Sequence, residues 1–294
     1  MEAFWADWGR GQFGGEAGAR AGLVLQKLDG GHLGINALIR GGAGTTDAAI
    51  DTFFAPLREL ESLRPQIRGA GNRERFDYWL NFIRASQLRV ETWVMADRLS
   101  AKMKEAAALP EAERKRSLVR GQALPLRVKL ARSYESMIAA YLESAKSPGD
   151  VGTISSIESG SRARVLSAHD AQMADILGEP LPPEASVSSV FRGTPRVFVS
   201  APRTEAPAAA PYELRVFVLS GEACKGVDLF WRPLGRRGFK KITADHRARQ
   251  AFRVTLPASA GGAAEYYVQA TLNGGAKLAW PRTAPALNQT VTLW

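Results

Sequence analysis

The chain has 294 residues, of which 45% are hydrophobic and 23% charged, and its 39 basic and 29 acidic side chains give a formal net charge of +10. This composition excludes a disordered tail, a collagen-like repeat and a membrane protein, and the single Cys224 excludes a disulfide framework and a four-cysteine zinc site. The length favours two domains, because one hydrophobic core rarely grows beyond about 250 to 300 residues.

The positive charge is unevenly distributed along the chain. Residues 1–190 hold 24 basic and 23 acidic side chains, whereas residues 191–294 hold 15 and 6. The change coincides with a switch from helical to alternating patterning, next to the prolines 180, 182 and 183. We therefore predict a multidomain α and β protein: an all-α helical array (1–178), a Pro-rich linker (179–194) and an all-β immunoglobulin- or fibronectin-like sandwich (195–294).

The helical pattern begins with an Ala-rich segment at 16–28, whose small residues predict the close approach of a neighbouring helix. A stripe of apolar residues then runs from Ile50 to Ile67, with Thr46 as its expected N-cap. Pro56 interrupts this stripe and is expected to kink or divide the helix, because it removes a backbone hydrogen bond. The segment from Arg73 to about Ala107 contains neither Gly nor Pro and predicts one long helix.

Further helices are expected at about 125–145 and at 161–177, the second capped by Gly178. The C-terminal part instead shows short runs rich in Val, Phe, Tyr, Thr and Trp between Pro- and Gly-rich turns. These runs predict eight strands, at 196–200, 213–220, 226–232, 238–243, 251–256, 265–272, 277–280 and 289–294. Pro281 and Pro285 favour an edge position for the last strand.

The densest aromatic cluster lies at the N-terminus, where Trp5, Asp7, Trp8 and Arg10 follow one another closely. Two indoles beside an acid and a guanidinium could stack on a sugar ring and hydrogen-bond its hydroxyls. The alternative interpretation is a helix that packs its Trp side chains into a core. We keep these four residues as the candidate ligand-binding set.

Signals for catalysis are weak in this sequence. The acids Asp7, Asp77, Glu91 and Asp97 could supply an acid/base pair, but most of them are more simply explained as solvated helix charges or salt-bridge partners. No Gly-x-Ser-x-Gly elbow occurs, and His32, His169 and His246 have no second His or Cys at metal spacing. The Gly-rich segment 40–46 lacks the lysine of a phosphate-binding loop. No catalytic residue, metal site or cofactor is predicted.

The basic excess of the C-terminal part is concentrated around its third and fourth strands. It comprises Arg232, Arg236, Arg237, Lys240, Lys241, Arg247 and Arg249. This patch is either a solvated strand face or a contact for an anionic polysaccharide or an acidic partner. The near-neutral helical part and the lack of any nucleic-acid recognition motif argue against nucleic acid as the partner.

Neither a transmembrane segment nor a signal peptide is evident in the sequence, which leaves the compartment open. The order of several motifs resembles the C-terminal portion of large bacterial glycoside-hydrolase-like proteins with a central α/β barrel, of the α-glucuronidase and β-hexosaminidase type. The motifs are Trp8-Gly-Arg-Gly-Gln-Phe-Gly, Gly71-Asn-Arg-Glu-Arg-Phe-Asp-Tyr-Trp-Leu, Trp231-Arg-Pro-Leu-Gly, Glu265-Tyr-Tyr-Val and Pro285-Ala-Leu-Asn-Gln-Thr-Val.

This resemblance implies a helical region that packs on a catalytic barrel, followed by an immunoglobulin-like accessory domain, in a parent protein that is secreted or periplasmic. In such proteins the catalytic acids belong to the barrel, which this chain does not contain. The first expectation is therefore a non-catalytic accessory region that contacts an oligo- or polysaccharide. The alternatives are a self-contained glycoside hydrolase with its site among the helices, and an adhesion or scaffold protein whose basic sandwich binds an acidic partner.

Overall fold

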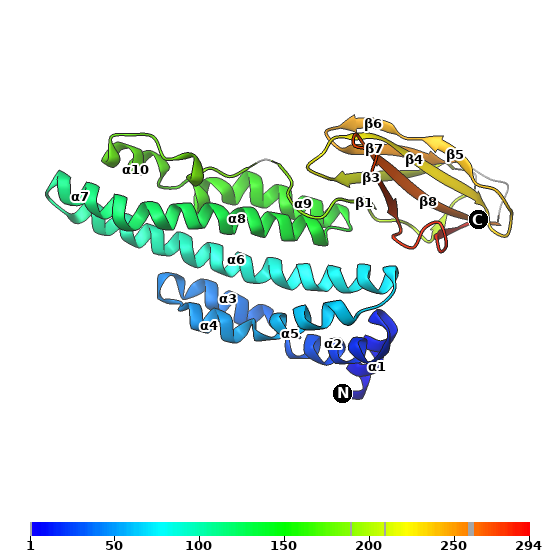
Figure 1. Cartoon of the computed structure of the whole chain (residues 1–294), viewed down its shortest axis with the longest axis horizontal. Coiled ribbons are helices and arrows are strands. Elements are labelled where there is room, and N and C mark those ends of the chain that lie inside the picture. The colour runs from blue at the N-terminus through cyan, green and yellow to red at the C-terminus, as the bar shows by residue number, and fades with distance from the viewer. Residues whose placement is uncertain (1, 189, 209, 258–261) are drawn as a thin grey trace. The chain divides into compact units, whose positions relative to one another are not determined.

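The computed structural model describes residues 2–188, 190–208, 210–257 and 262–294. The protein is a mixed α and β protein, with its α-helices between residues 2 and 177 and its strands between residues 196 and 293 (Figure 1). It divides into two compact units. The helical unit consists of residues 1–68, 75–144 and 152–189, and the two-sheet unit of residues 69–74, 145–151 and 190–294.

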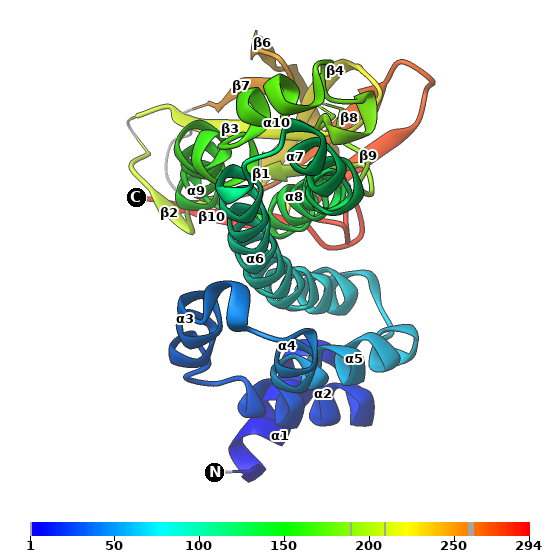
Figure 2. The ribbon, with the colours of Figure 1, turned by 90° about the vertical axis from the view of Figure 1, so that its left-hand side faces the viewer.

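The helical unit is arranged along one long helix, α6. Figures 1 and 2 show α3, α4 and α5 along one side of α6, and α7 and α8 along the other. The helical elements are α1 (Glu2–Phe13), α2 (Gly15–Lys27), α3 (His32–Arg40), α4 (Asp47–Phe53), α5 (Ala55–Leu63), α6 (Ala70–Ala108), α7 (Ala112–Leu118), α8 (Leu124–Ser144), α9 (Pro148–Ser156) and α10 (Asp170–Leu177). The shorter helical segments are η1 (Gly42–Gly44), η2 (Arg64–Gln66), η3 (Val119–Ala123), η4 (Ile157–Leu166) and η5 (Pro183–Ala185).

Two clusters of buried apolar side chains lie along α6. The cluster around Phe76 and Val90 includes Phe13 of α1 and Leu60 of α5, and the cluster around Met103 includes Tyr134 of α8. The long helix expected between Arg73 and Ala107 is therefore confirmed. It supplies core residues to both sides because its buried positions fall on different faces along its 39 residues.

The region around Pro56 follows the prediction from the sequence. The Thr46 hydroxyl caps α4 by accepting a hydrogen bond from the backbone N–H of Ala49 at 3.2 Å. Helix α4 then ends at Phe53, and α5 begins at Ala55 with Pro56 in its first turn. The proline thus divides the apolar stripe into two helices, because its ring can start a helix but cannot continue one.

The prediction of one helix over 161–177 is wrong. The chain forms the π-helical segment η4 up to Leu166, leaves helical geometry, and starts α10 only at Asp170. His169 bonds to Ser100 at 2.8 Å and Asp170 bonds to Arg127, so tertiary polar contacts override the local helical pattern at this point. Gly178 does end α10, with the expected left-handed φ of 75°.

The two-sheet unit contains each of the eight predicted strands with small changes of bounds, and two short strands, β2 and β6, that we did not predict. The strands are β1 (Arg196–Val199), β2 (Glu205–Ala206), β3 (Tyr212–Leu219), β4 (Cys224–Pro233), β5 (Lys240–Thr243), β6 (Asp245–Ala248), β7 (Ala251–Leu256), β8 (Gly262–Leu272), β9 (Lys277–Trp280) and β10 (Gln289–Leu293). One sheet has the order β1-β3-β7-β6, and the other has the order β2-β10-β8-β4-β5, with β9 also paired to β8.

The last strand does not lie at an edge, contrary to our expectation from Pro281 and Pro285. Strand β10 pairs antiparallel with β8 and parallel with β2, and both prolines lie in the turn that precedes it. Side chains from both sheets form one apolar core, with Trp231 and Tyr266 among its members. In the described part of the chain, no helix is both long and apolar enough to cross a membrane.

Candidate aromatic binding site

The candidate site begins with the close packing of α1 against α2. A Cβ atom on Gly22 would lie 2.0 Å from the carbonyl oxygen of Trp5, and one on Gly9 would lie 2.2 Å from the carbonyl oxygen of Gly18. Only glycine fits at such backbone-to-backbone contacts. The prediction of a closely approaching helix at 16–28 is confirmed. On the same helix α1, Trp8 contacts Trp79 of α6, with ring centroids 6.2 Å apart.

The side chains between α1, α2 and α6 enclose a cavity of about 350 Å³ that opens to solvent. We call it the aromatic hollow. Its lining consists of Phe4, Trp5, Trp8, Leu25, Leu28, Asp29, Trp79, Phe82 and Ile83. Five of these nine residues are aromatic, and the side chains of Phe4 and Phe82 are 64% and 44% exposed. The exposure matters because it keeps two walls of the hollow accessible to a ligand.

The rings of the hollow meet at steep angles. Phe4 and Trp5 are inclined by 79°, Trp5 and Trp8 by 77°, Trp8 and Trp79 by 77°, and Trp79 and Phe82 by 84°, with centroids 5.6 to 6.2 Å apart. Edge-to-face contacts of this kind are favourable, because the positive edge of one ring meets the negative face of the next. Because the rings are inclined and not parallel, they form the walls of a cavity and do not stack on one another.

Few polar groups line the hollow. Asp29 is its one charged residue, is exposed, and makes no side-chain hydrogen bond or ion pair within the described residues. The indole N–H groups of Trp5, Trp8 and Trp79 make no hydrogen bond there either, and none of them is a fully buried polar atom. The hollow is therefore lined by aromatic side chains, three of them indoles whose N–H groups have no partner among the described residues, and by the exposed carboxylate of Asp29.

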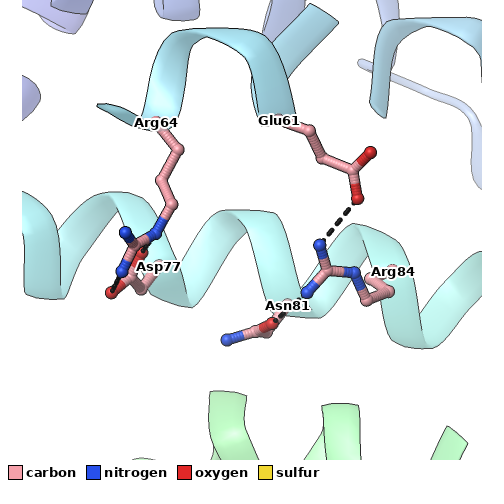
Figure 3. Close-up of polar contacts among 5 residues, drawn as sticks. All are labelled: Glu61, Arg64, Asp77, Asn81 and Arg84. Carbon is pink, nitrogen blue, oxygen red and sulfur yellow. Dashed lines mark hydrogen bonds and ion pairs between the residues drawn. The ribbon is translucent and has the colours of Figure 1, made fainter. Parts of the chain in front are cut away.

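Two ion pairs, one from α5 and one from η2, fix the part of α6 that carries its aromatic residues. In Figure 3, the guanidinium of Arg64 donates to both oxygens of Asp77, at 3.0 and 3.2 Å. Two turns further along α6, Arg84 donates to Glu61 at 2.6 Å and to the side chain of Asn81 at 3.2 Å. These contacts bracket the α6 segment that carries Trp79 and Phe82, and so position it.

The structure separates the four residues that the sequence singled out as ligand-binding. Trp5 and Trp8 line the hollow, whereas Asp7 and Arg10 do not. Arg10 donates to Asp7 at 2.8 Å and to Glu16 at 3.2 Å, so the two polar candidates bind to each other and to α2. The carboxylates raise the pKa of the Arg10 guanidinium, with Glu16 contributing most.

The other acids considered for catalysis are dispersed over the helical unit. Asp77 is bound to Arg64, and Asp97 lies beside Gly42, where a Cβ would come within 3.1 Å of its carboxylate. Burial raises the pKa of Glu91, against the effect of a hydrogen bond from Gln87 at 2.7 Å. Within the described ranges, no group of three metal-ligating side chains occurs.

The basic patch of the two-sheet unit is partly neutralised by neighbouring acids. Lys241 pairs with Asp228 at 2.9 Å, Arg232 with Glu265 at 2.8 Å, and Arg247 approaches Asp245 at 3.5 Å. The Lys240 ammonium lies 5.2 Å from the centre of the Trp231 ring. Among the described residues, Arg236, Arg237, Lys240 and Arg249 have no acidic partner, so these four cations carry the unpaired charge of the patch.

Most of the hollow is not evident from the sequence, which pointed to Trp5 and Trp8 alone among its nine lining residues. Phe4 belongs to the N-terminal aromatic cluster and could have been included, and Trp79 and Phe82 share a face of α6 because they are three residues apart. Asp29 carries no signal in the sequence, since it is a single acid after the end of a helix. Their convergence with Trp5 and Trp8 depends on tertiary packing.

Neither a family model nor a curated protein matches this chain. Part of the chain is similar to an engineered protein whose crystal structure has been solved, with 16% sequence identity and a TM-score of 0.28. The similarity covers 44% of this chain and 27% of the engineered protein. A likeness of this size supports no conclusion about fold or function.

Proposed function

We propose that this chain is a non-catalytic accessory region of a carbohydrate-active protein and that its aromatic hollow contacts a sugar. The two-sheet unit is, in this proposal, an immunoglobulin-like sandwich that accompanies the binding region. Support for the sugar contact comes from one observation above all: five aromatic side chains surround an open cavity that also presents hydrogen-bonding groups. The resemblance to the C-terminal portion of glycoside-hydrolase-like proteins favours the same function.

The chemistry of the hollow suits one face of a sugar ring. Pyranose rings have an apolar C–H face that packs on aromatic side chains, and hydroxyls around the rim that need hydrogen-bond partners. The indole N–H groups of Trp5, Trp8 and Trp79 can donate to those hydroxyls, and the Asp29 carboxylate can accept from them. The volume of about 350 Å³ lies at the lower end of the roughly 300 to 1,000 Å³ typical of small-molecule sites, which suits one or two sugar units.

A binding role without catalysis is supported by the positions of the four candidate acids, none of which is among the residues that line the hollow. Glycoside hydrolysis needs two carboxyl groups about 5 to 9.5 Å apart across a cleft, one of them free to give up its proton. Asp7 and Asp77 are each bound to an arginine, and the hollow itself contains the single carboxylate of Asp29. Because the hollow has one carboxylate and acid/base catalysis needs two, it suits binding better than catalysis.

Isothermal titration with a panel of neutral and charged oligosaccharides tests the proposal. The double variant F4A/F82A removes the two exposed walls without emptying the core, and we expect it to weaken sugar binding by about 5- to 150-fold, because stacked rings contribute about 0.5 to 1.5 kcal/mol each. Leu33→Ala is the matched control, since Leu33 is 70% exposed and lies outside the hollow. Absence of binding to every sugar, or equal loss in both variants, would contradict the proposal.

A further inference from the structure

We infer that the aromatic hollow selects a sugar that carries a protonated amino group, in preference to a neutral sugar and against a uronic acid. This inference rests on the proposed function and specifies the chemical class of its ligand. Three independent features of the hollow carry it: the orientation of its rings, the sign of its charged lining and the helix end that it contains.

The orientation of the rings favours a cation. The face of an aromatic ring is electron-rich, and an ammonium group within about 6 Å of the ring centre is attracted to it, most strongly by Trp. Three of the five rings are indoles, and successive rings are inclined by 77° to 84°. Because the planes of neighbouring rings differ by 77° or more, a cation in the hollow can meet the face of one ring while the next ring presents its edge.

The charged lining has one sign. Asp29 contributes a carboxylate, and no Lys, Arg or His among the described residues lines the hollow. The nearest basic residue in sequence, Lys27, is bound to Glu59 of α5 at 3.0 Å. An ammonium group would therefore gain a counter-ion in Asp29, whereas the carboxylate of a uronic acid would face a like charge with no cation to compensate it.

The end of α2 adds to this preference. Leu25, Leu28 and Asp29 come from the last turn of α2 and the residues directly after it. The aligned peptide dipoles of a helix give its C-terminal end a partial negative charge, which stabilises cations nearby. The helix end, the Asp29 carboxylate and the aromatic rings thus all favour a positively charged ligand.

Titration with three oligosaccharides of equal length tests the inference: oligomers of glucosamine, of N-acetylglucosamine and of galacturonate. Binding in the hollow is defined as the binding that F4A/F82A removes, so that any contact of galacturonate with the basic two-sheet unit is excluded. We expect glucosamine oligomers to bind about five- to tenfold more tightly than N-acetylglucosamine oligomers, and galacturonate not to bind in the hollow. Such a preference would oppose the net charge of +10, which repels cationic ligands.

Asp29→Asn keeps the shape of the hollow and removes its charge. We expect this variant to reduce the preference for glucosamine over N-acetylglucosamine to about twofold, while N-acetylglucosamine affinity changes little. Equal affinity of the wild type for the two sugars, an unchanged preference in D29N or binding of galacturonate in the hollow would overturn the inference and leave the proposed function standing. Failure of all three sugars to bind would overturn both.

Discussion

The helical unit and the two-sheet unit each carry a cluster of aromatic side chains, and the two clusters differ in what they leave open. On the outer face of the two-sheet unit, Phe230 and Tyr267 stack with an angle of 5° and a centroid distance of 4.8 Å. Phe239 meets Tyr267 edge-on at 5.1 Å, and the Arg232 guanidinium lies 4.2 Å from the centre of the Phe239 ring. The faces of Phe230 and Tyr267 are covered by their contact with each other, whereas the rings of the hollow surround a cavity.

The difference follows from secondary structure. Phe230 and Tyr267 are direct partners on the adjacent strands β4 and β8, so their rings are brought face to face by the register of the sheet. The rings of the hollow come from α1 and α6, whose side chains diverge from two cylinders and meet at an angle. The same residue types therefore make a closed surface on a sheet and an open site between helices.

The largest effect is expected where the helical unit relies on a buried charge. Arg127 is 3% exposed and donates to both oxygens of Asp170, at 2.6 and 2.9 Å. Asp170→Ala should lower the free energy of unfolding by about 3 kcal/mol, because it leaves the guanidinium buried without a counter-ion. The matched variant Asp228→Ala breaks the exposed pair with Lys241 in the two-sheet unit and should cost less than about 1 kcal/mol. Urea unfolding measures both; similar losses would contradict the contrast between the units.

A somewhat smaller effect on stability is expected at the contact between Gly22 of α2 and the backbone of α1, next to the hollow. Gly22→Ala should destabilise the protein by about 2 kcal/mol and weaken sugar binding, because the new methyl group would collide with the Trp5 carbonyl and push α1 away from α2. Gly11→Ala on α1 is the control: apart from its chain neighbours and the nearby backbone of α1 itself, no atom lies within 4 Å of its Cβ position, and the substitution should stabilise the helix by roughly 0.5 to 1 kcal/mol. Thermal unfolding and titration together check this; a Gly22→Ala variant as stable as the wild type would show that the helices are less closely packed.

The smallest effect is a difference in pH dependence between the two units. Burial raises the pKa of Glu91 above its ordinary value of 4.5, so the folded protein holds this proton more tightly, and the resulting stabilisation is lost as pH rises through the raised pKa. The hydrogen bond from Asn288, together with Arg232, lowers the pKa of Glu265, so its contribution is present above the ordinary value and is lost as pH falls through the lowered pKa.

Urea unfolding between about pH 3 and pH 7 separates these contributions. Glu91→Gln should remove a decline in stability that begins above the ordinary glutamate pKa, and Glu265→Gln should remove a decline that occurs below it. The difference between each variant and the wild type should therefore change with pH in opposite directions. If the two stability differences changed with pH in the same direction, the pKa shift given for one of the two glutamates would be wrong.

Much of the architecture could be predicted from the sequence because it depends on local rules. Helix α6 could be predicted because apolar residues recur at helical spacing along it. The cap at Thr46 and the division at Pro56 could be predicted because they depend on backbone hydrogen bonds within a few residues. The segment after Leu166 could not be predicted in this way, since Ser100 and Arg127, far away in the sequence, decide where α10 begins.

The sequence by itself determined the change from helices to strands, the distribution of charge and the candidacy of Trp5 and Trp8. Only the tertiary structure decided that these indoles meet Trp79, Phe82 and Asp29 around a cavity, and that Asp7 and Arg10 bind to each other instead. The physical reason for this difference is that the periodicity of a sequence indicates which face of a helix or strand is apolar. The distance and angle at which two such faces meet depend on contacts such as the glycine-to-backbone packing of α1 and α2.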